Sequence, residues 1–127
     1  MSTNDSHNIQ VDVKTTFLDA QSNRRENRFV YGYTITIKNL GDKSAQLISR
    51  HWIITDGNQG VQEVKGIGVI GEQPTIQPGE SYTYSSGAVL PTETGLMTGS
   101  YTMLDEDGET FSAPIPAFPL IPPNKLH

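Results

Sequence analysis

The sequence contains no cysteine, and this absence removes several classes of chemistry at once. Disulfide bonds, thiolate nucleophiles and cysteine-based zinc sites are all excluded. A chain without cysteine suits a reducing compartment. The first residues are polar and have neither the basic nor the apolar region of a signal peptide. We therefore expect a cytoplasmic protein.

Long apolar runs and an excess of positive charge are also missing. No segment is apolar over a length that could span a membrane. The chain has 9 Lys and Arg against 14 Asp and Glu, a formal net charge of -5. Such a field repels phosphate, which argues against nucleic acid and anionic lipid as partners. The histidines, His7, His51 and His127, are too far apart in sequence to indicate a transition-metal site.

Turn residues between short alternating segments are abundant, with 12 Gly and 8 Pro. Apolar and polar residues alternate over residues 9–17, 29–38 and 81–85, and we expect further strands over residues 45–56, 61–65, 100–104 and 109–113. Good helix formers do not cluster at helical spacing. About seven or eight such strands predict one all-β domain, an antiparallel β-sandwich of immunoglobulin or fibronectin type III character.

The two ends of this single domain, residues 1–127, are expected to differ from its body. Residues 1–8 are polar, which is typical of a flexible N-terminus. Residues 114–127 are rich in proline, which lacks a backbone donor. This C-terminal tail is therefore predicted to be extended, either along a sheet edge or off the sheet.

The segment 45–56 is predicted to be the third strand and to supply a core anchor. Strand alternation puts Ile48, Trp52 and Ile54 on one face together with Arg50, and Leu47, His51 and Ile53 on the other. Trp52 is the only tryptophan, and in a sandwich such a residue commonly fills the space between the sheets.

Residues 66–71 form a literal G-x-G-x-x-G string with glycines at Gly66, Gly68 and Gly71. In a dinucleotide site such a string leads into a helix whose N-terminus binds pyrophosphate. Here Pro74 and Pro78 follow within one helix length, which excludes that helix. The string is instead predicted to form a corner of the sandwich, and weak anion binding by its N–H groups stays an alternative.

Four carboxylates gather between the last two strands, at Asp105, Glu106, Asp107 and Glu109. Mg²⁺ and Ca²⁺ prefer such oxygens, so this turn is a weak candidate for a divalent metal. The spacing is not that of an EF-hand, and an exposed acidic hairpin tip is the favoured interpretation.

No catalytic constellation is present in the sequence. The segment Ser85-Ser86-Gly87 lacks the G-x-S-x-G elbow of a serine hydrolase. His51 is the only interior histidine and has no partner pattern. The chain is accordingly predicted not to be an enzyme and to need no cofactor.

An ordered series of turn and strand residues resembles one known family. The series comprises residues 50–60, 64–74, 78–80 and 84–87, then Thr92, Gly95, Met97, Gly99, Tyr101, Gly108, Phe111, Ile115, Pro116 and Phe118. It is similar to the ApaG family from about residue 9 to residue 120. The resemblance implies a fibronectin type III-like sandwich. In bacteria the family is associated with cobalt resistance and magnesium efflux, and related eukaryotic domains look like protein-binding modules fused to F-box and polymerase-interacting proteins.

The sequence thus favours a non-catalytic module that binds an unknown protein and is linked at most indirectly to Co²⁺ and Mg²⁺ homeostasis. Sheet edges and extended segments are the surfaces that such modules use. The candidate contact residues are Glu72, Gln73, Pro74, Ile115, Pro116 and Phe118. The alternative is a protein that binds a small ligand or a divalent metal at residues 66–71 or 105–109. Whether the chain forms a homo-oligomer stays open.

Overall fold

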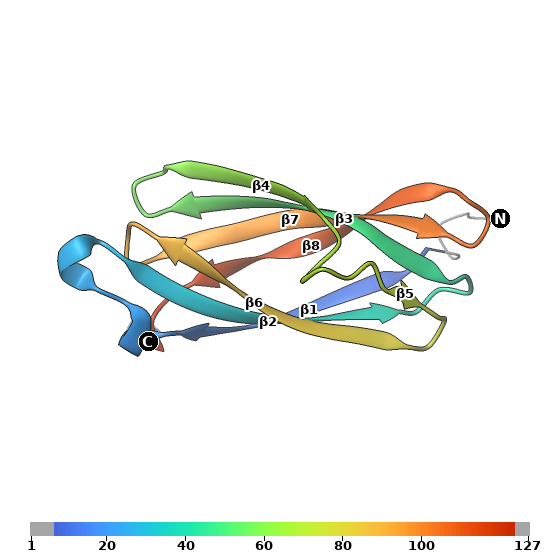
Figure 1. Cartoon of the computed structure of the whole chain (residues 1–127), viewed down its shortest axis with the longest axis horizontal. Coiled ribbons are helices and arrows are strands. Elements are labelled where there is room, and N and C mark those ends of the chain that lie inside the picture. The colour runs from blue at the N-terminus through green and yellow to red at the C-terminus, as the bar shows by residue number, and fades with distance from the viewer. Residues whose placement is uncertain (1–6, 124–127) are drawn as a thin grey trace.

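The structure, a computed structural model, describes residues 7–123 and consists of two antiparallel sheets packed face to face (Figure 1). One sheet has the order β1-β2-β6, built from β1 (Ile9–Phe17), β2 (Phe29–Asn39) and β6 (Ser81–Leu90). The other has the order β4-β3-β7-β8, from β4 (Val61–Ile67), β3 (Ala45–Asp56), β7 (Gly95–Asp105) and β8 (Thr110–Leu120), with β5 (Thr75–Ile76) also paired to β3. The predicted all-β antiparallel sandwich is confirmed.

Two short 3-10 turns, η2 (Asp19–Gln21) and η3 (Arg24–Glu26), connect β1 to β2. They are the helical elements of residues 7–123, and neither is long or apolar enough to cross a membrane.

The core lies between the sheets and is filled by every second residue of the central strands. β2 alternates buried and half-buried positions along most of its length, as its sequence pattern predicts. Trp52 of β3 is 3% exposed and packs edge-on against Tyr101 and Phe118. The prediction that this residue anchors the core is confirmed.

A β-bulge in β3 overturns part of the predicted face assignment. The pairing with β7 shifts between Leu47 and Ser49, so Ile48 is an extra residue. Strand alternation is broken there, and Leu47 becomes fully buried while Ile48 is only half-buried. The prediction put Leu47 on the other face of the strand from Trp52 and put Ile48 on the same face as Trp52. Both assignments are wrong because of the bulge.

The proline-rich C-terminal segment forms β8, an edge strand of the larger sheet, in agreement with one of the two predicted arrangements. Its prolines at 114, 116 and 119 are exposed, while Ile115, Phe118 and Leu120 are buried. Residues 1–6 of the predicted flexible N-terminus and residues 124–127 at the end of the predicted tail lie outside the described residues. His7 stacks on Phe111 with 3.9 Å between the ring centroids.

Candidate functional site

The glycine loop, residues 66–71, lies on the side of the sandwich bordered by the edge strands β4 and β6. β4 borders the larger sheet and β6 borders the smaller one. After β4 the chain leaves the sheet and runs toward β5 (Figure 1). One pocket opens beneath the loop between the sheets, and one shallow groove lies beside it on the outer face.

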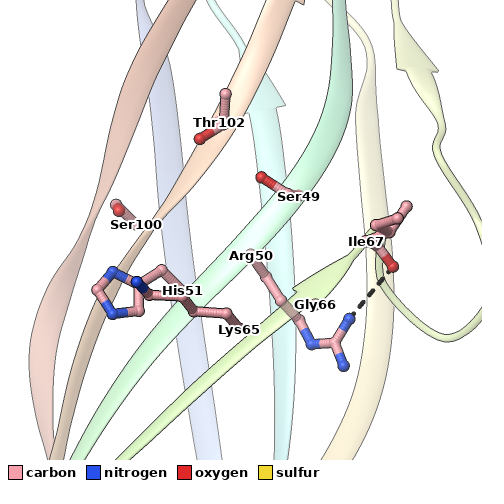
Figure 2. A pocket seen from close by; sticks show the side chains of 8 residues that line it. All are labelled: Ser49, Arg50, His51, Lys65, Gly66, Ile67, Ser100 and Thr102. Atoms are coloured by element: carbon pink, nitrogen blue, oxygen red, sulfur yellow. Dashed lines mark hydrogen bonds between the residues drawn. The ribbon is translucent and has the colours of Figure 1, made fainter.

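Gly66 leaves space that the side chain of Arg50 occupies. The two residues face each other across β3 and β4, and a Cβ at Gly66 would lie 2.6 Å from the guanidinium carbon. Arg50 passes over this glycine, and its Nη1 donates to the carbonyl oxygen of Ile67 at 3.3 Å (Figure 2). The same Nη1 donates to the carbonyl oxygen of Gly68 at 2.8 Å. The first glycine of the string therefore makes room for a cation that fastens the loop.

Gly68 and Gly71 are required by backbone conformation. Both have positive φ, 65° and 74°, where residues with a Cβ are strained. A Cβ at Gly68 would also lie 2.2 Å from the carbonyl oxygen of Glu72. No helix follows Gly71 within the described part of the chain, which continues to β5. The string thus forms a corner, and the helix N-terminus of a dinucleotide site is absent from these residues.

Ile70 occupies an unfavourable position at the tip of the loop. Val69 and Glu72 exchange two backbone hydrogen bonds, of 2.8 Å and 2.9 Å, around Ile70 and Gly71. Because both central residues have positive φ, with 48° at Ile70, this is a type I′ turn. Such turns favour Asn or Gly, whereas a β-branched residue with positive φ is an outlier. The Ile70 side chain is nevertheless 59% exposed, so burial within the chain does not account for its presence.

The pocket under the loop has a volume of about 260 Å³ and combines aromatic walls with one cation. Tyr33, Trp52 and Tyr84 line it together with Arg50 and the loop residues. Within residues 7–123, no carboxylate lies at ion-pair distance from Arg50, whose bonds go to carbonyl oxygens. A guanidinium has five N–H donors, so several are left for a bound group.

The hydroxyls of Tyr84, which lines this pocket, and of its partner Tyr101 are unsuited to act as bases. Tyr84 and Tyr101 share a 2.5 Å hydrogen bond between their hydroxyl oxygens. Burial raises the pKa of Tyr84 to about 12 and raises that of Tyr101 further. Both hydroxyls are therefore neutral at physiological pH, and their role is to join the two sheets.

The outer groove, of about 480 Å³, lies across β4, β3 and β7 and is lined by Ser49, His51, Lys65, Ile67, Ser100 and Thr102 (Figure 2). His51 Nε2 lies 3.0 Å from Glu63 Oε2, and this contact, followed by the charge of Lys65, lowers the pKa of the Glu63 carboxyl. Among the described residues no serine or threonine hydroxyl is hydrogen-bonded to the His51 ring. The groove thus has the His51–Glu63 contact at its margin and no nucleophile–base pair.

Three of the four carboxylates of the acidic turn have different partners. Asp105 is buried, accepts hydrogen bonds from the amides of Asp107 and Glu109, and lies 2.8 Å from His7 Nε2. Glu106 accepts from the amide of Ser44 and Asp107 pairs with Lys43. In residues 7–123, no three acidic or histidine side chains converge into a metal-binding group. The prediction of an exposed acidic tip is wrong for Asp105, because the turn needs its oxygens as acceptors.

The predicted contact residues fall into two groups. Gln73 donates from Nε2 to the Ile48 carbonyl and the Pro74 carbonyl accepts from the Leu47 amide, so both fasten the loop to the bulged part of β3, while Glu72 closes the type I′ turn. The residues of the second group lie in β8, where Ile115 and Phe118 are buried in the core and only Pro116 is exposed. The roles of Arg50, Ile67 and Ile70 were missed, because the left-handed conformation of a residue and its burial depend on the folded loop.

Comparisons with known proteins agree on one family. The model of the ApaG domain matches residues 19–105. The chain is 52% identical to Protein ApaG of Dechloromonas aromatica over all of both chains, and 55% identical to Protein ApaG of Pseudomonas paraeruginosa over 95% of this chain and 96% of the relative. A crystal structure described as that of an ApaA protein from Bordetella pertussis superposes with a TM-score of 0.89 at 45% identity, covering 92% of this chain and 95% of the other. The chain therefore belongs to the ApaG family.

Proposed function

We propose that this chain is a non-catalytic protein-binding module whose contact surface is centred on Ile70. The observation that carries the proposal is the combination of strain and exposure at this residue. Holding a non-glycine residue in the left-handed region costs about 1–2 kcal/mol. Strained conformations that the chain itself does not need cluster at functional sites. An exposed isoleucine at the tip of a rigid turn is suited to insert into an apolar pocket of another protein.

The surroundings of Ile70 support a polypeptide as the ligand. Ile67 is 77% exposed and lines the same pocket, so two apolar side chains flank its opening. Arg50 lies beneath them, and within residues 7–123 its N–H donors bond to carbonyl oxygens of the loop. A partner segment with an apolar side chain and a carboxylate or carbonyl acceptor satisfies both features. Any link to Co²⁺ or Mg²⁺ homeostasis then operates through that partner.

The experiment compares Ile70→Asn with a matched apolar surface variant. Leu40 is 53% exposed at the turn after β2, away from the loop, so Leu40→Asn makes the same chemical change elsewhere. Full-length wild type and both variants are immobilised and used for quantitative capture from lysate of the source cells. The purified captured protein is then titrated by calorimetry.

We expect a partner that binds wild type and Leu40→Asn with equal affinity and Ile70→Asn at least about tenfold more weakly, as for an interface anchor residue. Equal affinity for Ile70→Asn rules out this contact surface. If wild type retains no protein specifically, the protein-binding function itself is contradicted.

A second candidate function is binding of a small anion under the glycine loop. The observation that favours it is the pocket of about 260 Å³ that contains the Arg50 guanidinium without a carboxylate partner among residues 7–123. Calorimetric titration with ATP, inorganic phosphate and MgCl₂ tests it, with Arg50→Gln as the control. If wild type binds with micromolar affinity and Arg50→Gln does not, the result favours the anion over the protein partner. If the titrations give no heat change, the small-ligand function is contradicted.

A further inference from the structure

β4 is an edge strand, and among residues 7–123 only Arg50, at the Ile67 carbonyl, bonds to the backbone on its outer side. Just before β4, the Asp56 amide donates to the Gly60 carbonyl at 2.9 Å, and just after it, the Gly68 amide donates to the Ile48 carbonyl at 2.8 Å. Residues of an antiparallel strand alternate in the side to which their N–H and C=O groups point. The even-numbered residues therefore bond to β3, and the free edge presents the backbone groups of Val61, Glu63, Lys65 and Ile67.

The same four residues carry their side chains on the outer face of the sheet. Lys65 is paired with His51 and Ile67 with Ser49, and both of these cross-strand pairs line the outer groove. Val61 is 64% exposed, and Ile67 at the other end of β4 is similarly open to solvent. Val64, opposite Trp52, belongs to the other face and is 38% exposed. The strand thus has apolar side chains at both ends and at its centre that residues 7–123 do not bury.

The sequence of β4 is self-complementary when it is paired antiparallel with itself about Val64. In this register Glu63 lies opposite Lys65 of the second copy, and Lys65 lies opposite Glu63 of the second copy. Val61 lies opposite Ile67 of the second copy, and the two Val64 residues face each other. Opposite charges and apolar pairs directly across strands are the arrangements that stabilise a sheet. All the facing odd-numbered residues have outward-pointing backbone groups, so the ladder of hydrogen bonds is complete.

We propose that two copies of this chain associate through β4, about a two-fold axis at Val64, into a dimer with one continuous sheet. A two-fold axis repeats each contact, so one Glu–Lys complementarity provides two ion pairs. The Ile67 carbonyl, which accepts from Arg50 at 3.3 Å, has a second lone pair for the amide of Val61 of the second copy. The dimer does not depend on the proposed function, since Ile70, on which that function is centred, follows β4 and is not among the paired residues; Ile67 borders both surfaces.

Two other edges differ from β4 in ways that disfavour pairing. β8 contains Pro114, Pro116 and Pro119, and prolines cannot donate to an added strand. β1 has the same acid-x-lysine spacing at Asp12 and Lys14. Its apolar residues, however, pack against the core of their own chain, so pairing would bury little new apolar surface. β1 therefore serves as a matched control edge.

The test is a charge exchange read out by sedimentation equilibrium or light scattering over a concentration series. Glu63→Lys and Lys65→Glu each place like charges opposite each other twice in the dimer. The double variant Glu63→Lys/Lys65→Glu restores opposite charges with the order exchanged. Asp12→Lys makes the same kind of change on the β1 edge. Circular dichroism verifies that all variants are folded, as expected for substitutions of exposed side chains.

We expect wild type and Asp12→Lys to dimerise with the same dissociation constant. Each single β4 variant should raise this constant by at least about tenfold, because two attractive pairs become repulsive. The double variant should return it to within about threefold of wild type, and an equimolar mixture of the two single variants should form a heterodimer. In wild type the amides of Glu63 and Lys65 should exchange more slowly with solvent as concentration rises. A monomeric wild type, or a dimer that the single variants leave unchanged, overturns the proposal.

Discussion

Replacing Ile70 by asparagine is expected to stabilise the folded chain while it weakens partner binding. The type I′ turn holds Ile70 at φ 48°, and relief of this strain by a residue that tolerates the left-handed region is worth about 1–2 kcal/mol. The side chain is 59% exposed, so the burial it loses is a minor part of the roughly 1.5–3 kcal/mol of a fully buried isoleucine, about 1 kcal/mol or less. The net effect is a gain of roughly 0.5–1 kcal/mol, and a rise in melting temperature of about 2–4 °C.

Two further variants separate strain from packing in this turn. Ile70→Val keeps the β-branch and therefore the strain, so its stability should stay within about 0.5 kcal/mol of wild type. Gly71→Ala adds a Cβ that meets nothing within 4 Å, so its expected loss of about 1–2 kcal/mol measures the conformational cost alone. Urea denaturation followed by the fluorescence of Trp52 gives all the free energies of unfolding. A loss of stability of more than about 0.5 kcal/mol in Ile70→Asn refutes the reasoning, since Ile70 would then contribute more through packing than it costs through strain.

Three other predictions concern the loop, the buried tyrosines and the acidic turn. Gly68→Ala should lower the free energy of unfolding by about 3 kcal/mol or more, which exceeds the loss for Gly71→Ala. The reason is that residue 68 has positive φ and that its added Cβ would also lie 2.2 Å from the Glu72 carbonyl oxygen; denaturant unfolding checks the order. Tyr84→Phe should cost about 1–3 kcal/mol because it leaves the buried Tyr101 hydroxyl without its partner, and the double variant Tyr84→Phe/Tyr101→Phe should cost less than the sum of the two single variants in the same assay. The contact with His7, followed by the amides of Glu109 and Asp107, lowers the pKa of Asp105, so its stabilising contribution is complete above the unfolded-state pKa of about 4 and is lost as the pH falls through the lower folded-state pKa. Asp105→Asn should therefore flatten the acid limb of the plot of unfolding free energy against pH. An unchanged acid limb contradicts the assignment.

The architecture was accessible from the sequence because strand alternation reports directly on burial. In β2 the aromatic and β-branched residues recur at every second position, and the structure buries these positions between the sheets. Pro74 and Pro78 excluded a helix after Gly71 on covalent grounds alone, and the structure has the β5 strand there. Local rules suffice for such features because they depend on the residue itself and its immediate neighbours.

The alternation rule failed where pairing between strands controlled the outcome. Ile48 is an ordinary strand residue by type, yet the register shift between β3 and β7 makes it the bulged residue and directs the Leu47 side chain into the core. Asp105 is a second such case, because composition assigns it to an exposed acidic tip whereas the turn uses it as an acceptor for two amides. A bulge or a buried acceptor is a property of paired segments, and a single strand does not encode it.

By itself, the sequence determined the all-β class, the strand period and the family resemblance, because each depends on short-range spacing. Only the tertiary structure decided what the glycine string does. Gly66 makes room for Arg50, Gly68 avoids the Glu72 carbonyl, and Gly71 completes a turn that leaves Ile70 strained and exposed. These roles arise from contacts between β3, β4 and the loop, segments that meet only after the chain has folded, and the spacing of three glycines is the same in a phosphate-binding loop and in a sandwich corner.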